Sequence, residues 1–328
     1  MTSPSSLANE IRSDDRRQLA RAITLVESTR PEHRVQAEAL LSELMPHTGK
    51  SIRIGISGIP GVGKSTFIEA LGLHLIKQGH KVCVLAVDPS SPRTGGSILG
   101  DKTRMEELSR NRSAFIRPSP SGGTLGGVAR RTRESILLCE AAGFDIVLVE
   151  TVGVGQSETA VADLVDMFIL LIVPGGGDEL QGIKKGIVEL ADLIVVNKAD
   201  GDLMPAAERA RRDYGAALHL LRATSENWQP KILLCSSLSG AGISEIWETA
   251  EAYKHAKLST SAFNERRTSQ AKAWMWDEIH ENLIEKLKTD PNVAKLMPSV
   301  EAGVRSGDMT PTQAARKILS ALEDKKNI

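Results

Sequence analysis

The sequence predicts an α/β fold in which helices cover both faces of a mostly parallel central sheet. Two continuously apolar stretches, at 82–87 and 146–149, and the isoleucine-rich run IRIGI at 52–56 alternate with amphipathic helical stretches. Apolar runs without alternation are typical of strands buried on both faces, and strands separated by helices are typical of parallel pairing. Ligands of such sheets bind outside the carboxyl ends of the strands. The other expected strands lie at 168–173, 194–196 and 232–234.

Helical patterns flank the predicted sheet on both sides. Residues 14–28 and 32–45 carry apolar residues at helical spacing, with a proline between them, and predict a helical hairpin. After about Tyr253 no strand pattern follows, and residues 268–288 and 310–323 have helical patterns. The expected domains are an N-terminal helical extension over 1–48, a nucleotide-binding domain over 49–258 and a C-terminal helical arm over 259–328.

The predicted helix 268–288 carries an apolar stripe, for which two interpretations stay open. The stripe packs on the chain's own domain, or it forms an interface with a second copy. Two tryptophans and a methionine within one turn, at 274–276, are common in interfaces, which favours a homodimer. The stripe consists of Trp276, Ile279, Leu283 and Leu287.

Composition excludes several classes of protein. The chain has 328 residues with an apolar fraction of 41 %, enough for one α/β domain with additional helices. Its 41 basic and 41 acidic residues leave no net charge, and aromatic residues make up only 3 %. Neither a nucleic acid nor a membrane is therefore an expected partner. The longest strongly apolar run, 167–173, is too short to span a bilayer.

The N-terminal segment and the cysteines favour a cytoplasmic protein. No apolar run follows the start of the chain, so no secretory signal is expected. Three widely spaced cysteines, Cys83, Cys139 and Cys235, predict neither a disulfide framework nor a metal site. The seven histidines show no metal-ligand spacing either.

The strongest motif is GIPGVGKS at 58–65, between a predicted strand and the predicted helix 65–78. It fits the phosphate-loop pattern, in which glycines let backbone amides surround the phosphates and the following helix points its positive end at them. Lys64 is expected to reach the β- and γ-phosphates, and the Ser65 hydroxyl to bind Mg²⁺. The motif is typical of P-loop NTPases. The expected phosphate-binding residues are Gly58, Ile59, Pro60, Gly61, Val62, Gly63, Lys64, Ser65 and Thr66.

A second motif, NKAD at 197–200, follows another predicted strand. The carboxylate of Asp200 can accept hydrogen bonds from the ring N–H and the exocyclic amine of guanine, a pair that adenine does not offer. A buried carboxylate left without partners costs about 1–3 kcal/mol or more, so the motif favours GTP over ATP. The other residues expected at the base are Asn197, Lys198, Ser236, Ser237 and Leu238.

Two segments resemble nucleotide-sensing switches. After the strand 146–149, Glu150 is expected to hold the Mg²⁺ shell and Gly153 to sense the γ-phosphate. Gln156 either orients the attacking water or is a solvated side chain. The other segment, the glycine-containing stretch 88–104, is the predicted first switch. Its Asp101 is expected to be a second carboxylate ligand of Mg²⁺.

Asp88, at the end of a predicted strand, is expected either to support the metal ligands as an acid or to position water as a base. With it, the expected catalytic residues are Lys64, Asp88, Asp101 and Glu150, and the expected Mg²⁺ ligands are Ser65, Asp101 and Glu150.

The segment 174–185 leaves a central strand through three consecutive glycines. Such a run is costly unless the backbone must move, which favours a mobile loop that contacts a partner. A plain solvated connection is an equally open interpretation. The residues concerned are Gly175, Gly176, Gly177, Asp178, Glu179, Lys184 and Lys185.

The runs DPSSPRTGGSILGDKTRM at 88–105 and ETVGVGQSE at 150–158 closely resemble the MeaB/ArgK-type GTPases. This group of metallochaperone-like GTPases has glutamate in place of the usual switch aspartate, and the resemblance covers essentially the whole chain. It implies that the chain is a GTPase chaperone of adenosylcobalamin-dependent methylmalonyl-CoA mutase, which gates cofactor loading and protects the mutase from inactivation. It also implies a homodimer formed by the C-terminal helices and a third switch over 174–185. The family's nucleotide residues correspond here to Gly61, Gly63, Lys64, Ser65, Asp101, Glu150, Asn197, Lys198 and Asp200.

Two other functions stay open at this point. Similar proteins have been labelled as kinases or ATPases of amino-acid transport systems, but such enzymes usually take ATP, against which Asp200 argues. A metal-insertion GTPase would need a Cys/His cluster, which the sequence does not contain.

Overall fold

The computed structural model describes residues 4–87, 105–118, 125–151, 157–175, 185–221 and 228–323. The chain forms two compact units, Met1–Gln270 and Ala271–Ile328, and the division between them falls inside helix α13 (Ala262–Thr289). The sequence places the start of the C-terminal arm at 259, and the division into three domains stays a prediction. Among the described residues, no helix combines the length and the apolar character needed to cross a membrane.

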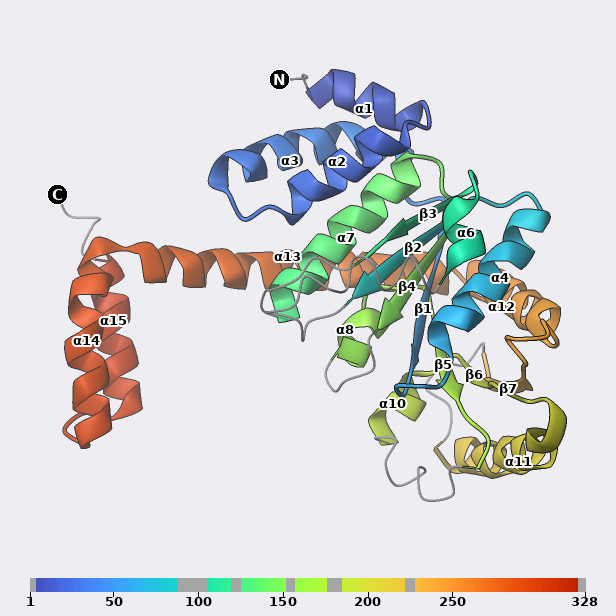
Figure 1. The fold of residues 1–328 in the computed structure, drawn as a ribbon. Helices are drawn as coiled ribbons and strands as arrows, with labels where there is room; N and C mark the ends of the chain where they lie inside the picture. The colour runs from blue at the N-terminus through green and yellow to red at the C-terminus, as the bar shows by residue number, and fades with distance from the viewer. Residues whose placement is uncertain are drawn as a thin grey trace. The chain divides into compact units, whose positions relative to one another are not determined.

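A seven-stranded parallel sheet forms the centre of the first unit, in the order β3-β2-β4-β1-β5-β6-β7 (Figure 1). The predicted fold class is therefore confirmed. Because β1 lies between β4 and β5, the loops that follow these three strands share one edge of the sheet. The strands are β1 (Ile52–Gly58), β2 (Val82–Val87), β3 (Ala114–Arg117), β4 (Ile146–Thr151), β5 (Met167–Ile172), β6 (Leu193–Val196) and β7 (Lys231–Leu234).

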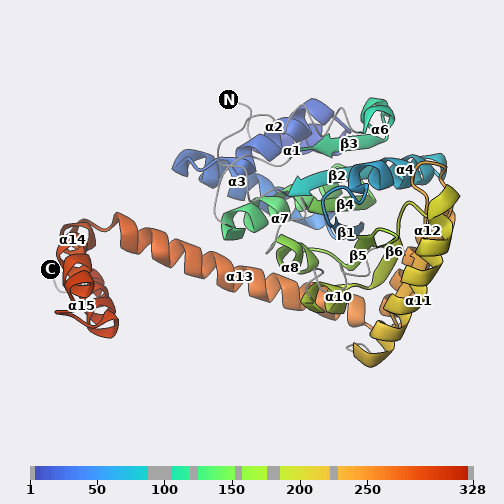
Figure 2. The same ribbon diagram turned by 60° about the horizontal axis from the view of Figure 1, so that its bottom comes forward.

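Two layers of helices enclose this sheet (Figures 1 and 2). α4, α6 and α12 build the main core on the face that carries Ile52, Ile54 and Ile56. α7 and α8 cover the opposite face, where Arg53 of β1 makes a buried ion pair with Glu140 of α7 at 2.8 Å. The helices that follow the N-terminal extension in this unit are α4 (Lys64–Lys77), α6 (Glu106–Arg110), α7 (Leu125–Ala141), α8 (Ser157–Ala162), α10 (Lys185–Leu190), α11 (Met204–Leu221) and α12 (Ile243–Leu258).

Gly55 lets α8 approach the central strand closely. A Cβ atom added there would lie 3.0 Å from side-chain atoms of Val161, Val165 and Phe168. Any larger residue would have to push α8 away from β1, because packed cores do not absorb extra atoms freely. This contact therefore sets how closely α8 packs on the central strand.

The N-terminal extension is a bundle of three helices, whereas the sequence predicts a hairpin of two. The additional helix, α1, buries Leu7, Ala8 and Ile11 on one face, a short helical pattern that the sequence-based prediction missed. Asp15 caps the second helix, its Oδ1 accepting hydrogen bonds from two amides of the first turn at 2.9 and 3.2 Å. All three helices contact α7 (Figure 1). Their bounds are α1 (Pro4–Arg12), α2 (Arg16–Glu27) and α3 (Pro31–Leu44).

Arg267, near the start of α13, binds the amino-terminal edge of the sheet. Its guanidinium donates two hydrogen bonds to the carboxylate of Asp166, at 2.8 and 2.6 Å. It also donates to the carbonyl oxygens of Gly49 and Ser51, at 2.6 and 2.8 Å. Burial opposes the charge of Arg267, but the bonds to Asp166 raise its pKa overall. The first turns of α13 therefore belong to the first unit.

The second unit consists of the rest of α13 with α14 (Pro291–Ser306) and α15 (Pro311–Glu323). The sequence predicts α13 and α15 but misses α14, because Pro298 and Gly303 interrupt its helical pattern. The buried residues of its small core are Val293, Val300, Ala314 and Ile318.

The apolar stripe of α13 divides into two parts. Its last member, Leu287, packs against the core formed by α14 and α15. Trp276 and Leu283 are 50 and 53 % exposed, and Ile279 is 36 % exposed. Most of the stripe is thus uncovered within its own unit, which leaves the homodimer as a proposal taken up below.

Candidate nucleotide-binding site

Three glycines shape the loop between β1 and α4. Gly61 and Gly63 have positive φ angles of 82° and 94°, a region that residues with a side chain rarely adopt. A Cβ atom at Gly58 would lie 2.5 Å from the carbonyl oxygen of Leu171, and one at Gly63 would lie 2.8 Å from Nδ2 of Asn197. With glycine at these positions, the backbone can turn its amides toward an anion at the N-terminus of the 14-residue helix α4.

Lys64 begins α4 and folds back over this loop. Its Nζ donates hydrogen bonds to the carbonyl oxygens of Gly58 and Ile59, at 2.7 and 3.3 Å. Burial lowers the pKa of Lys64, while the carboxylates of Glu150 and Glu158 act in the opposite direction. A bound triphosphate can replace the two carbonyl oxygens as the partner of this ammonium group.

Ser65 and Glu150, two of the predicted Mg²⁺ ligands, lie side by side. The Ser65 hydroxyl donates a hydrogen bond of 3.3 Å to Oε1 of Glu150, which is 6 % exposed at the end of β4. The register of the sheet explains the proximity, because Glu150 stands opposite Ile56, two residues before the phosphate loop begins. The pair offers oxygen atoms of the type that Mg²⁺ prefers.

Asn197 joins the two predicted nucleotide loops. Its Nδ2 donates to the carbonyl oxygen of Val62 in the phosphate loop at 2.9 Å. Its Oδ1 accepts from the amide and the hydroxyl of Ser237, at 3.1 and 2.7 Å. Lys198 adds a second link, from its Nζ to the carbonyl oxygen of Gly61 at 2.8 Å. The loop predicted to recognise guanine is therefore fixed to the loop predicted to bind phosphates.

Asp200 points toward the segment that follows β7. Its carboxylate accepts a hydrogen bond from the hydroxyl of Ser236. Leu238, also predicted at the base, is 89 % exposed. Leu238 lies two residues after the serine that bonds to Asp200, so an apolar side chain and a carboxylate come from connected segments at the predicted base site.

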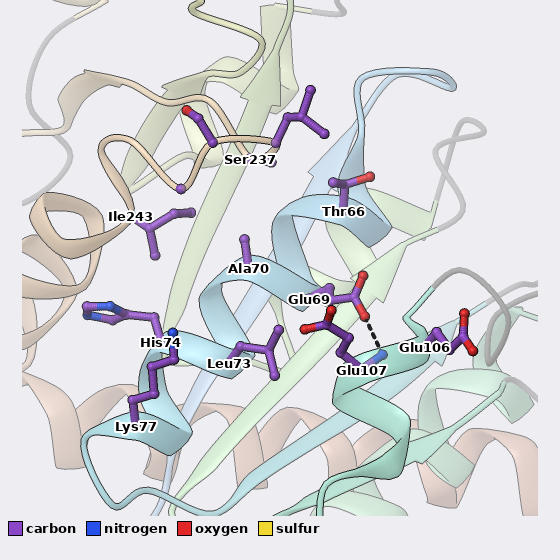
Figure 3. A pocket seen from close by; sticks show the side chains of 13 residues that line it. Thr66, Glu69, Ala70, Leu73, His74, Lys77, Glu106, Glu107, Ser237 and Ile243 are labelled. Carbon is purple, nitrogen blue, oxygen red and sulfur yellow. Dashed lines mark hydrogen bonds between the residues drawn. The ribbon is translucent and has the colours of Figure 1, made fainter.

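A cavity of about 730 Å³ runs along α4 beside these loops (Figure 3). Thr66, Ser237 and Leu238 line the end near the predicted nucleotide site. The rest follows α4 through Lys77, and α6 closes one side, where Oε1 of Glu69 accepts a hydrogen bond from the amide of Glu107 at 2.9 Å. The cavity thus lies between α6 and the helix that begins at Lys64.

Several predicted site residues lie outside the described ranges. Gly175 follows β5 with a φ of 97° and open space around it, and Lys185 begins α10. The predicted residues that the structure does not describe are Asp88, Asp101, Gly153, Gln156, Gly176, Gly177, Asp178, Glu179 and Lys184.

Glu158 is a site residue that the sequence-based prediction missed. It is 5 % exposed in the first turn of α8, and its charge acts on Lys64. The signal in the sequence was its position at the end of the ETVGVGQSE run, where a charged residue begins a helix. Nothing in that pattern distinguishes a buried acid from a solvated one.

A strand, a glycine loop and a helix that begins at Lys64, with Asn197 bonded to the same loop, define a P-loop GTPase. The family model described as methylmalonyl Co-A mutase-associated GTPase MeaB matches residues 19–292. The chain belongs to the MeaB family.

Similar proteins extend over nearly the whole chain. A putative GTPase of Caulobacter vibrioides is 57 % identical over 317 residues, 96 % of this chain and 97 % of that protein. The mouse protein named methylmalonic aciduria type A homolog, mitochondrial, is 52 % identical over 94 % of this chain and 76 % of its own length. A crystal structure described as LAO/AO transport system kinase has a TM-score of 0.77 at 40 % identity, and the match covers 98 % of this chain and 97 % of that one. The predicted family and the GTPase class are confirmed.

Replacing Lys64 by alanine should abolish nucleotide binding and leave the fold intact. We expect GTP affinity to fall at least ~100-fold, because charge-assisted hydrogen bonds contribute roughly twice as much as neutral ones. Calorimetric titration measures the affinity, and thermal unfolding without nucleotide checks the fold. Lys77→Ala, on the same helix, is the matched control. A Lys64→Ala protein that binds GTP normally would refute the phosphate-loop assignment.

Replacing Asp200 by asparagine should change the preferred base. The variant loses the acceptor for the guanine N–H groups, so GTP affinity should fall by roughly 10²-fold. Xanthosine triphosphate carries a carbonyl where guanine has its amine, and the asparagine amide can donate to it, so its affinity should rise. Competition titrations measure both changes. Asp202→Asn, an exposed neighbour, is the control, and unchanged GTP affinity in Asp200→Asn contradicts the assignment.

Proposed function

We propose that this chain is a GTP-hydrolysing chaperone of adenosylcobalamin-dependent methylmalonyl-CoA mutase, which gates cofactor loading and protects the mutase from inactivation. The match to the mutase-associated family over 19–292 carries this proposal. The name of the mouse relative, methylmalonic aciduria type A homolog, supports the same metabolic context. The link that Asn197 makes between the two nucleotide loops supports GTP as the nucleotide.

Mg²⁺ accompanies the nucleotide in this proposal. The 3.3 Å contact between the Ser65 hydroxyl and the Glu150 carboxylate supports a site at which these two residues, with Asp101, hold the ion. When bound, the ion neutralises charge on the phosphate oxygens. The main-chain amides of the phosphate loop and the Lys64 ammonium bind the phosphates, and the Gly153 amide senses the γ-phosphate.

Hydrolysis by the chain alone should be slow, because none of the motifs identified in the sequence assigns an arginine to the transition state. Asp88 is our candidate for the base that positions water. A partner could instead reposition a cation of this chain toward the transition state, and our candidates for that cation are Arg104, Lys184 and Lys185. A partner that supplies or orders such a cation accelerates GTPases by roughly 10³–10⁵-fold.

The segment 174–185 is our candidate for the loop that senses the mutase. It leaves β5, which is the direct neighbour of β1 in the sheet. The helix that follows it, α10, packs against α8, and α8 follows the predicted switch after Glu150. A movement of the segment 174–185 could therefore reach the predicted switch after Glu150 through the contact between α10 and α8.

The chain forms a homodimer in our proposal, through the exposed part of the α13 stripe. The exposure of Trp276, Ile279 and Leu283 supports an interface there, because large apolar side chains gain most from burial against a partner. A cytoplasmic location is also proposed. The three cysteines, all buried free thiols, suit a reducing compartment.

A kinase or ATPase of a transport system is the second candidate, in keeping with the name of the similar crystal structure. The predicted preference of Asp200 for guanine supports GTPase chemistry instead. Release of inorganic phosphate without any phosphorylated protein separates the two functions.

Methylmalonyl-CoA mutase should accelerate GTP hydrolysis in single-turnover experiments. If the mutase orders a missing cation, the rate of hydrolysis should rise roughly 10³–10⁵-fold. The Lys64→Ala variant with mutase gives the background rate. Equal rates of hydrolysis with and without mutase would contradict the proposed coupling. So would a failure of this protein to co-purify with the mutase in the presence of a non-hydrolysable GTP analogue.

Leu283→Glu should convert the dimer to monomers, because a charge would be buried without a partner at the interface. Sedimentation equilibrium measures the change. Leu319→Glu places the same charge on an equally exposed leucine of α15, at 52 % exposure, and should leave the dimer intact. A monomeric wild-type protein contradicts the proposed interface.

A further inference from the structure

Two buried hydroxyl groups connect the central strands at the edge of the sheet where the nucleotide site lies. The hydroxyl of Thr151, at the end of β4, donates a hydrogen bond of 2.9 Å to the hydroxyl of Ser57 in β1. Thr151 is fully buried and Ser57 is 1 % exposed. Neither hydroxyl has a role in the hydrolysis proposed above. Burying two hydroxyls is less favourable than burying an apolar pair, so this bond needs a reason.

The neighbours of the two hydroxyls in the sequence belong to the nucleotide site. Ser57 directly precedes Gly58, where the phosphate loop begins, and Thr151 directly follows Glu150, a proposed Mg²⁺ ligand. Successive side chains of a strand point to opposite faces of the sheet. Glu150 points to the face covered by α4, where it meets Ser65, and Thr151 therefore points to the opposite face. The backbone next to the carboxylate is thus held from the face that Mg²⁺ does not occupy.

The pairing of the strands shows which end of the bond is fixed. β4 pairs with β1 as far as Glu150, which stands opposite Ile56. On its other side β4 pairs with β2 one residue further, with Thr151 opposite Val87. At Thr151 the hydroxyl bond continues the connection between β4 and β1. Ser57 lies inside β1 and also pairs with β5, so Ser57 is the fixed end and the last residue of β4 is the end that it holds.

We propose that Thr151 is a positioning residue, whose bond to Ser57 fixes the backbone beside Glu150 so that this carboxylate is in place for Mg²⁺. The inference rests on the proposed Mg²⁺ site at Ser65 and Glu150. Mg²⁺ requires nearly ideal ligand geometry, and a ligand that is already held in position needs no ordering when the ion binds. The hydroxyl pair therefore acts on the affinity for Mg²⁺ and, through the ion, on the affinity for a nucleoside triphosphate.

Thr151→Val removes the hydroxyl and keeps the branched shape of the side chain. The measured quantity is the Mg²⁺ enhancement, defined as the affinity for a non-hydrolysable GTP analogue with Mg²⁺ divided by its affinity in EDTA. Calorimetric titration gives both affinities. We expect Thr151→Val to lower the Mg²⁺ enhancement about tenfold, which corresponds to one net hydrogen bond, and to leave the affinity in EDTA unchanged. Thr151→Ser keeps a hydroxyl and should retain the wild-type enhancement.

A double variant separates positioning from stability. Ser57→Ala leaves the Thr151 hydroxyl without its acceptor and should lower the Mg²⁺ enhancement as Thr151→Val does. Together the two changes leave no unpaired hydroxyl, so the thermal stability should return toward that of the wild type. The Mg²⁺ enhancement should stay low in the double variant, because the bond is still missing. A pair with a purely structural role would recover both quantities together.

Thr132→Val is the matched control, because it makes the same change at a buried threonine of α7, whose hydroxyl donates to the carbonyl oxygen of Val128 at 2.9 Å. It should keep the wild-type Mg²⁺ enhancement even if it lowers stability. The inference is overturned if Thr151→Val or the double variant, shown to be folded by thermal unfolding, keeps the wild-type enhancement, or if Thr132→Val lowers it equally.

The wild-type protein provides the test of the metal site itself. If its affinity for the analogue does not respond to Mg²⁺, the proposed Mg²⁺ site is wrong and this inference falls with it. If the wild type responds and Thr151→Val responds equally, the inference alone is wrong. The titrations contain no mutase, so their outcome does not depend on the proposed chaperone function.

Discussion

The carboxamide of Asn197 is the contact on which the nucleotide site depends. It is 1 % exposed, and it binds the carbonyl of Val62 on one side and the amide and hydroxyl of Ser237 on the other. The hydrogen bonds of Asn197 therefore connect two loops of the protein and are not directed at a ligand. Gly63 must be glycine partly because this carboxamide occupies the space of a Cβ atom. The distance between the loops predicted to bind the phosphates and the base is consequently set by hydrogen bonds within the protein.

Charge in the site is arranged around the single ammonium group of Lys64. Two carboxylates act on it, and its own hydrogen bonds go to loop carbonyl oxygens. A triphosphate would add further negative charge beside these acids, and a cation bound with it would offset part of that charge. Mg²⁺ bound at Glu150 would neutralise the charge of one of these two carboxylates.

Sequence reasoning recovered the elements that leave strong local patterns. The apolar strands beside β1 and the phosphate loop could be predicted because burial on both faces and glycine conformations restrict the residues allowed there. β3 could not, since it is a four-residue edge strand that ends in Arg117. α14 was missed because tertiary packing tolerates Pro298 inside a helix. Glu158 escaped because burial of an acid depends on how α8 packs on Gly55, which no local pattern encodes.

The bonds of Arg267 set a lower limit on a self-sufficient nucleotide domain. A chain cut after residue 258, where the strand and helix patterns suggest a boundary, would lose the guanidinium that binds Asp166 and the carbonyl oxygens of Gly49 and Ser51. It would also lose Gln270, whose Nε2 donates to the carbonyl of Val165 at 2.9 Å. Asp166, itself 1 % exposed, would remain as a buried carboxylate without its counter-ion. The shortest fragment with an intact sheet therefore ends beyond residue 270, inside the helix that carries the apolar stripe.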